Sequence, residues 1–257
     1  MSTVLDSIIE GVKEDLFKRK QARPTLEDSI LNAPKVIDAH KALSAPGISI
    51  IAEVKRSSPS KGDLAQISDP AHLAIDYQTA GAAVVSVLTE ARRFKGSIDD
   101  FKLVRSAINI PMLRKDFTVD EYQVLESRAI GADMQLLIVA ALSKSQLKDF
   151  YQIGTDLGLA SLFEVHSLEE LEIALEVDPR IVGVNSRNLK NLEVDSKTFD
   201  KVIPQIPSGI IKVAESGISK RSEVAHLEEL GANAILVGET LVKAQSPAIA
   251  IAELLGR

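Results

Sequence analysis

The sequence contains no cysteine and no tryptophan, and only 4% of its 257 residues are aromatic. The absence of cysteine excludes disulfides, thiolate nucleophiles and cysteine-ligated metal sites, and it agrees with a reducing compartment. Long apolar runs are also missing, since the longest, residues 134–142, is interrupted by Gln135 and is far shorter than the ~20 residues of a membrane span. Residues 1–20 alternate apolar and charged side chains and do not resemble a signal peptide. We therefore expect a cytoplasmic protein without a membrane partner.

The chain has no excess of positive charge. It has 30 Lys and Arg against 36 Asp and Glu, a formal net charge of −6, which argues against a nucleic-acid partner because such proteins usually carry a basic face. Its 45% hydrophobic and 26% charged residues are typical of a globular protein. The length fits one large α/β domain or two ordinary ones. Because no linker or change of composition marks a boundary, we expect one domain over residues 1–257, and no obligate protein partner is inferred.

Eight short runs rich in β-branched residues recur along the chain, each followed by an amphipathic stretch. Runs that are nearly all apolar are typical of strands buried on both faces of a parallel sheet. The predicted strands are Ile48–Lys55, Ala83–Thr89, Pro111–Lys115, Met134–Val139, Ala160–Val165, Ile181–Asn185, Ile211–Glu215 and Ala234–Val237.

The stretches between these runs carry the start and stop residues of helices. Aspartate or serine before an amphipathic stretch caps a helix, and glycine at its end provides the left-handed residue that stops it. The predicted starts are Asp69-Pro70, Asp120, Ser167 with Glu170, and either Ser219 or Ser222. The predicted ends are the Gly-Ala pairs at 81–82, 131–132 and 231–232.

Eight β–α units in succession predict an α/β fold, a (β/α)8 TIM barrel. A doubly wound open sheet is the alternative, but it more often has five to seven strands and a glycine-rich first turn, and neither a G-x-G-x-x-G nor a Walker sequence is present. Residues 1–45 precede the first predicted strand and are expected to form one or two extra helices, an N-terminal extension packed on the barrel.

Polar residues end several of the predicted strands, and the carboxyl ends of barrel strands are where chemistry occurs. Charges at such a rim are costly unless they are paired or used, and lysines beside glutamates can have their pKa values moved towards neutrality. This is the requirement for acid and base chemistry near pH 7. The strand-end candidates are Glu53, Lys55, Lys115, Glu164, Asn185 and Glu215.

The last two strands are followed by small residues, Ser216-Gly217-Ile218 and Gly238-Glu239-Thr240. Backbone N–H groups can converge at such turns, and this is the usual phosphate position in barrels of this kind. We prefer a phosphate site here to the simpler interpretation that these glycines only make tight turns.

The histidines and two phenylalanines are weaker candidates for a functional site. The four histidines, at 40, 72, 166 and 226, show no metal-ligand spacing, so we assign them to structure or to the surface and expect no metal. Phe94 and Phe117 lie in strand-end loops and could pack the loops or form a wall for a flat ring.

Taken together, the motifs resemble the indole-3-glycerol-phosphate synthase family. The similarity extends from the N-terminal helix to the last unit, and six separate motifs agree in order. They are Glu53-Val54-Lys55-Arg56 with Ser58-Pro59-Ser60 and Gly62, Leu113-Arg114-Lys115-Asp116-Phe117, Glu164-Val165-His166, Ile181-x-Gly183-Val184-Asn185-x-Arg187-x-Leu189, Ala214-Glu215-Ser216-Gly217 and Val237-Gly238-Glu239.

The resemblance implies a carboxy-lyase of tryptophan biosynthesis that needs no metal or organic cofactor. Such an enzyme converts 1-(2-carboxyphenylamino)-1-deoxyribulose 5-phosphate, an anionic sugar phosphate, into indole-3-glycerol phosphate and releases carbon dioxide and water. By this resemblance Lys115 is the general acid at the carbonyl oxygen, and Glu164 stabilises the cationic ring intermediate and takes part in proton transfer. Lys55 contacts the anionic groups of the substrate.

The resemblance also implies roles for the other rim residues. Orientation of these groups and of the sugar hydroxyls falls to Glu53, Asn185, Arg187 and Glu215. Substrate binding involves Ser58 and an apolar enclosure of Phe94, Phe117, Leu136, Ile138, Leu189 and Leu236. Phosphate is held by Ser216, Gly217, Gly238 and Glu239, the last through its backbone, with help from Lys55.

One position departs from the family pattern. The family often has two asparagines before the arginine of the sixth strand, and here the second is Ser186. By strand alternation Ser186 should face away from Asn185, so we expect little effect on the chemistry.

Two other functions remain open. A sister phosphate-binding barrel such as phosphoribosylanthranilate isomerase would typically supply a cysteine and aspartate pair, and this chain has no cysteine. A barrel that only binds a sugar phosphate or a partner would be indicated by loss of Lys115 or Glu164, and both are present.

Overall fold

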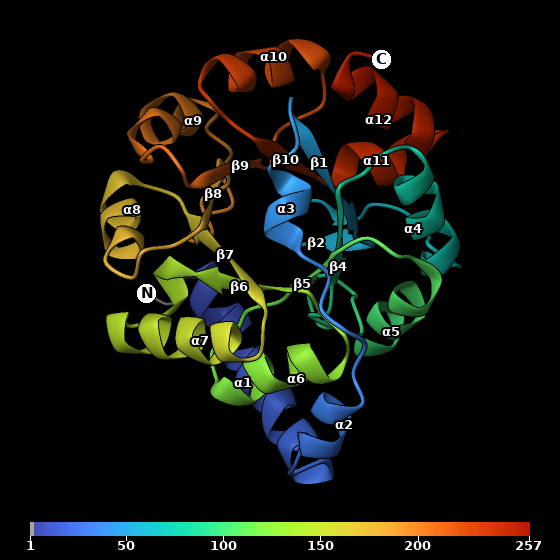
Figure 1. The fold of residues 1–257 in the computed structure, drawn as a ribbon, viewed down its shortest axis with the longest axis vertical. Coiled ribbons are helices and arrows are strands. Elements are labelled where there is room, and N and C mark those ends of the chain that lie inside the picture. Colours follow the sequence, from blue (N-terminus) through green and yellow to red (C-terminus); the bar gives the residue numbers. More distant parts are fainter. Residues whose placement is uncertain (1–2) are drawn as a thin grey trace.

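The computed structural model describes residues 3–257 and contains eight parallel strands closed into a barrel (Figure 1). Neighbouring strands follow the order of the chain, and the last pairs with the first to close the ring, with Ser49 opposite Ala234. The predicted (β/α)8 barrel is confirmed, and every predicted strand boundary lies within one residue of the observed one. The barrel strands are β1 Ser49–Val54, β4 Val84–Leu88, β5 Met112–Lys115, β6 Met134–Ile138, β7 Ala160–Val165, β8 Ile181–Asn185, β9 Ile211–Glu215 and β10 Ala234–Val237.

Helices cover the outside of the barrel between successive strands (Figure 1). They are α4 Pro70–Thr79, α5 Ile98–Ala107, α6 Glu121–Ala129, α7 Lys144–Asp156, α8 Leu168–Leu175, α9 Lys197–Val202, α10 Arg221–Glu229, α11 Glu239–Lys243 and α12 Pro247–Leu255, with short 3-10 turns η1 Val139–Ala141 and η2 Ile203–Gln205. A hairpin of two-residue strands, β2 Ser57–Ser58 and β3 Gly62–Asp63, lies in the loop after β1. The sequence did not predict this hairpin, because two residues are too few to form a hydrophobic pattern.

Most of the predicted helix starts are confirmed. The side chains of Asp69, Asp120 and Ser167 each accept a hydrogen bond from a backbone N–H of the following turn. The glycines of the three Gly-Ala pairs have φ values of 93°, 88° and 89°, the left-handed conformation that ends a helix.

The predicted start of α10 is wrong. The helix begins after Lys220, and neither Ser219 nor Ser222 caps it. The carboxylate of Glu223 accepts instead from the backbone N–H groups of Ser219 at 2.7 Å and Lys220 at 3.0 Å. A glutamate that reaches back over the first turn therefore replaces the serine hydroxyl.

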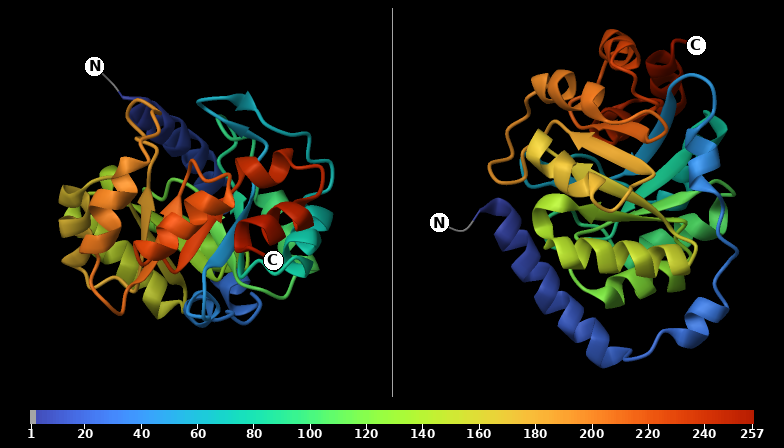
Figure 2. Two further views of the ribbon diagram at one scale, coloured as in Figure 1. Left: turned by 90° about the horizontal axis from the view of Figure 1, so that it is seen from above. Right: turned by 60° about the vertical axis from the view of Figure 1, so that its left-hand side comes forward.

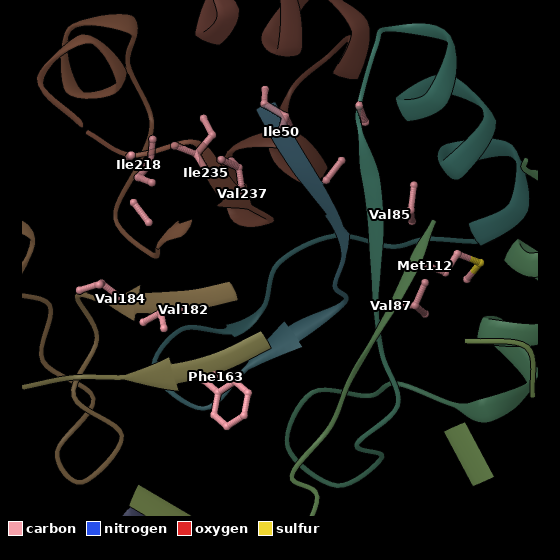
Figure 3. Close-up of a cluster of buried hydrophobic side chains, with 14 of the residues drawn as sticks. Ile50, Val85, Val87, Met112, Phe163, Val182, Val184, Ile218, Ile235 and Val237 are labelled. Carbon is pink, nitrogen blue, oxygen red and sulfur yellow. The ribbon is translucent and has the colours of Figure 1, made fainter. Parts of the chain in front are cut away.

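Alternation along the strands divides the buried side chains into two apolar clusters. One cluster lies between the strands and the outer helices, and Figure 3 shows its members, among them Ile50, Val85 and Phe163, on the strands. The other cluster lies inside the barrel and includes Ile51 and Leu113. Because the side-chain period of a strand is two, an outward Val54 requires an inward Glu53.

Residues 3–45 contain three helices, where one or two were expected: α1 Val4–Ala22, α2 Glu27–Leu31 and α3 Ala39–Leu43. The long helix α1 lies along one side of the barrel in Figure 2, and its Ile8 belongs to the same buried cluster as Phe117. In Figure 1, α3 lies across the middle of the ring of strands, and its Leu43 is completely buried. The chain before α3 is held near the start of β6, where Ile37 N–H donates to Asp133 at 2.7 Å.

No helix among residues 3–257 is both long enough and apolar enough to cross a bilayer.

Candidate active site

A cavity of about 480 Å³ lies at the carboxyl ends of the barrel strands. Every residue that the sequence analysis selected for catalysis, substrate binding or phosphate binding lines it, although their individual roles remain predictions. The wall also includes residues that were not selected, among them Ile8 from α1, Lys61 from the loop after β1 and Lys243 from α11. These come from segments whose position relative to the barrel mouth is decided by tertiary packing.

Two lysines and three glutamates form three ion pairs at the base of the cavity. Lys115 Nζ is 2.9 Å from Glu164 Oε2 and 3.4 Å from Glu215 Oε2, and Lys55 Nζ is 2.8 Å from Glu53 Oε1. The side chains of Glu164 and Glu215 are each 1% exposed. Strand alternation directs all five side chains inward, so charges distant in the sequence converge in a nearly dry site.

The pairing moves the pKa values of this cluster in different directions. Burial disfavours the Lys115 ammonium, but the charges of Glu164, Glu215 and Glu53 outweigh burial and raise its pKa. Burial likewise opposes the charge of Glu164, but Lys115 and His166 lower its pKa below the usual range. Lys115 is therefore a proton donor held in its charged form, and Glu164 is a carboxylate.

The pKa of Glu215 moves in the opposite direction to that of Glu164. Burial, together with the charges of Glu164 and Glu53, raises the pKa of Glu215 to about 8 in spite of Lys115. Neither of its carboxylate oxygens has a hydrogen-bond partner among residues 3–257. Its carboxylate lies against Gly183, where a Cβ would overlap Oε1, so only glycine leaves room for it. Near pH 7 this carboxyl group is expected to hold a proton.

Replacing Glu215 with glutamine is expected to raise thermal stability in a pH-dependent way. The folded protein keeps a proton on Glu215 that the unfolded chain releases above its ordinary pKa of 4.5, so wild-type stability falls as pH rises from about 5 to about 8. Glutamine does not ionise, so the gain of the variant over wild type should be larger at pH 8 than at pH 5 by roughly 3 kcal/mol, with about 2–4 °C in Tm for each kcal/mol. Melting curves at pH 5 and pH 8 test this, and an equal difference at both pH values would contradict it.

An apolar wall faces the charged cluster. The rings of Phe94 and Phe117 lie with centroids 5.9 Å apart and planes at 39°. Leu136 and Ile138 of β6 and Leu236 of β10, all nearly buried, continue the wall. A flat aromatic group beside this wall would be shielded from water while its polar end faced the lysines.

The loops after β9 and β10 form another side of the cavity. Thr240 Oγ1 donates to the carbonyl of Ile218 at 2.8 Å and joins the two loops. Ser216 and Gly217 both have left-handed φ values, 69° and 72°. A Cβ on Gly238 would lie 2.6 Å from Glu53 Oε1, so the Glu53–Lys55 pair packs directly against this turn.

The loop after β1 crosses the mouth of the cavity. Arg187 donates to Ser60 Oγ at 3.0 Å, and Lys61 Nζ lies 2.8 Å from Glu239 Oε1. Ser58 lines the cavity in the same loop. Arg56, in contrast, turns away from the cavity and pairs with Asp100.

His166 is the residue that the sequence analysis underestimated. Its imidazole is 10% exposed, with Nε2 3.4 Å from Glu164 Oε1 and Nδ1 3.0 Å from Glu170 Oε2. The sequence did not predict this contact, because the histidines were judged by metal-ligand spacing and a pair of His166 with Glu164 does not depend on such spacing. His72 and His226 are exposed and His40 is half-buried, in agreement with their assignment to structure or surface.

Ser186 lies outside the reacting groups, as its alternation with Asn185 predicted. It is buried, and its hydroxyl lies 3.3 Å from the carbonyl of Glu215 and 3.1 Å from that of Ser216. We expect Ser186→Asn to change kcat by less than about threefold, or about 0.6 kcal/mol, because an asparagine amide can donate to the same carbonyls. Steady-state kinetics check this value, and a larger change would show that the hydroxyl positions the β9 loop for turnover.

Among residues 3–257, no group of three or more Asp, Glu or His side chains is arranged to hold a metal ion.

A family model and the sequences of similar proteins agree on one family. A family model described as indole-3-glycerol phosphate synthase matches residues 5–254. Indole-3-glycerol phosphate synthases of Streptomyces griseus and Rhodococcus opacus are each 50% identical to the chain, with 98% of this chain and 94% of each relative covered. A solved chain of the tryptophan synthase complex from Pyrococcus furiosus is 18% identical with a TM-score of 0.60, covering 81% of this chain and 98% of that one, which shows a shared fold alone.

Proposed function

Since this chain belongs to the indole-3-glycerol phosphate synthase family, we propose that the cavity at the carboxyl ends of its strands is where the indole ring is closed. The chain is a carboxy-lyase of tryptophan biosynthesis that acts on a small molecule. We assign 1-(2-carboxyphenylamino)-1-deoxyribulose 5-phosphate as the substrate at this site. One domain over the whole chain and a cytoplasmic location remain predictions.

The cavity offers a complementary surface to each part of this substrate. The apolar wall of Phe94, Phe117 and Leu236 fits the aromatic ring, and the loops after β9 and β10 fit the phosphate. Five lysine and arginine side chains line the cavity against five acidic ones, of which Glu215 is expected to hold a proton near pH 7, in a protein whose net charge is −6. An anionic substrate is therefore attracted by the field of the cavity and not by the protein as a whole.

Ring closure begins with attack of the carboxyl-bearing ring carbon on the sugar carbonyl. The carbonyl oxygen gains a proton as the carbon–carbon bond forms, and we assign Lys115 as its donor. The Lys115 ammonium is the observation that carries this proposal, because it is held between Glu164 and Glu215 at the base of a largely apolar cavity. Holding the two carbons near each other beside a preorganised acid removes much of the entropic and electrostatic cost of the step.

Two losses restore the aromatic system. The carboxylate leaves as carbon dioxide and returns its bonding electrons to the ring, and the new hydroxyl leaves with a proton as water while the adjacent carbon loses a proton. We assign Glu164 as the anion that stabilises the cationic intermediate and takes part in this proton transfer. Asn185 donates to Glu164 Oε1 at 3.0 Å and would keep the carboxylate in place.

The remaining rim residues orient the substrate. Lys55 would contact the anionic groups and assist the phosphate site, with Glu53 holding its ammonium at 2.8 Å. We assign Glu215 to the sugar hydroxyls and Arg187 to the closing of the loop after β1. In the phosphate site, backbone groups of Ser216, Gly217, Gly238 and Glu239 would contact the phosphate oxygens.

Indole fluorescence tests the proposed function directly. Purified protein is mixed with the carboxyphenylamino-deoxyribulose phosphate without added metal, and the chain's lack of tryptophan keeps the background low. A steady rise at the indole band supports the assignment of substrate and site. Binding without a rise would favour a barrel that only binds a sugar phosphate. The absence of both binding and turnover would contradict the assignment of the cavity.

A further inference from the structure

A chain of three side chains connects the cavity to the protein surface behind it. Glu164 faces the cavity at the end of β7, His166 lies two residues later, and Glu170 is in the first turn of α8. His166 Nδ1 lies 3.0 Å from Glu170 Oε2 and its Nε2 lies 3.4 Å from Glu164 Oε1. Their side-chain exposure increases outward, from 1% for Glu164 to 10% for His166 and 17% for Glu170.

Local structure fixes the orientation of the imidazole. Ser167 caps α8 and places Glu170 so that its Oε2 also accepts the backbone N–H of His166 at 2.8 Å. One carboxylate oxygen therefore holds both the main chain and the ring of His166. With Nδ1 occupied in this way, Nε2 is the ring nitrogen left to face Glu164.

The contact between His166 and Glu164 depends on the charge of the ring. Nε2 is buried and makes no hydrogen bond among the described residues, although it lies at ion-pair distance from Glu164. As an imidazolium, His166 attracts both carboxylates. As a neutral ring that keeps its Nδ1 proton for Glu170, it would turn a lone pair towards an anionic oxygen, which would push Glu164 away from Lys115 and Asn185.

The surroundings favour the charged ring. Burial opposes it, but Glu164 and Glu170 outweigh burial and raise the pKa of His166 to about 9. Beyond Glu164 lie Lys115 and, 3.4 Å from that lysine, Glu215. Of the other elements that pack on α8, η1 has no titratable residue, and α9 makes no ion pair to His166 among the described residues.

We propose that His166 is a positioning residue for Glu164, which it holds as a correctly placed carboxylate from behind the cavity while Glu170 anchors its ring. This rests on the proposed function, because it assigns a role to a residue that supports Glu164 in that reaction. His166 does not line the cavity and is not a catalytic residue.

The test compares His166→Gln, Glu170→Gln and the control His226→Gln, which changes an exposed histidine that pairs with Asp200 at 2.7 Å. Glutamine at 170 can still accept from the main chain, so α8 should remain capped. For each variant, kcat and KM are measured from pH 6 to pH 10, and imidazole ¹⁵N chemical shifts are followed over the same range. The shift that His166→Gln removes identifies His166 among the four histidines of the chain.

We expect His166→Gln to lower kcat about tenfold while KM changes less than twofold, and His226→Gln to leave both unchanged. Wild-type kcat should decline above pH 9 as His166 loses its proton, and this decline should be absent in His166→Gln. Any decline near pH 8 from Glu215 should occur in both proteins, so the difference between the profiles belongs to His166. In Glu170→Gln, the titration of His166 and the decline in kcat should move together to lower pH.

An unchanged kcat profile in His166→Gln, or a His166 titration that Glu170→Gln does not move, would overturn the positioning role. If wild-type protein forms no indole product, the proposed function fails instead. The imidazole titration still reports on the three-residue chain in that case, so the two failures are distinguishable.

Discussion

Replacing Lys115 with alanine is expected to lower kcat by at least about a thousandfold while the protein remains folded. A positioned general acid typically contributes 10²–10⁴ in rate, and Lys115 is the ammonium that lies between the buried side chains of Glu164 and Glu215. Lys55, the other lysine of the charged cluster, is paired with Glu53 at 2.8 Å and is assigned to the anionic groups of the substrate. Initial rates of indole formation give the size of the loss, and circular dichroism with a melting curve shows whether the fold is retained.

Lys144→Ala is a matched control for this experiment. Lys144 is an exposed lysine of α7 that pairs with Glu176 on the surface, so its loss should leave kcat unchanged. Substantial residual turnover in folded Lys115→Ala, for example a loss of less than tenfold, would show that another group donates the proton.

Replacing Glu164 with glutamine is expected to lower kcat by about a hundredfold or more, with a much smaller change in KM. Glutamine keeps the size of the side chain but removes the negative charge that we assign to the cationic intermediate and the proton transfer. It also removes the largest of the charges that raise the pKa of Lys115. The pKa of Lys115 should therefore fall, and a loss of activity at high pH should begin at a lower pH than in wild type.

Steady-state kinetics from pH 6 to pH 10 measure both effects. Glu176→Gln is a suitable control because Glu176 is an exposed glutamate whose partner, Lys144, lies outside the cavity. A variant with Glu164→Gln that turns over within tenfold of wild type would contradict the assignment of Glu164, whatever its effect on Lys115.

Both predictions depend on one arrangement of charge. Three buried glutamates, Glu53, Glu164 and Glu215, share two lysines, and the surplus of negative charge leaves Glu215 protonated near neutral pH. Burying unpaired charge is costly, so the arrangement is expected to reduce stability in favour of function. The expected gain in stability of Glu215→Gln follows from the same surplus.

Much of the fold could be predicted because its strands are continuous apolar runs. A strand buried on both faces must be apolar along its length, so both ends of all eight strands were predicted to within one residue. Capping residues act over three or four positions, and Asp69, Asp120 and Ser167 were correctly identified. The start of α10 was missed because Glu223 reaches back over the turn, and no rule about the first residue of a helix includes that contact.

The candidate site was predictable to the extent that strand ends mark it. Alternation within a strand decides which residues face inward, and the barrel brings eight strand ends to one rim, so Glu53, Lys115 and Glu164 could be placed together before any distance was known. The contribution of Ile8 was not visible, because nothing in the spacing of α1 shows that it packs beside Phe117.

The barrel, the inward face of each strand and the charged residues at the rim could be predicted, since they depend on local patterns of apolar and polar residues. The partners, distances and protonation of those residues depend on how distant segments of the chain pack together. His166 shows the difference, because a lone histidine after a strand became part of a Glu164–His166–Glu170 chain once β7 and α8 were packed. Electrostatic interactions depend on distance and burial in three dimensions, and neither is a property of sequence spacing.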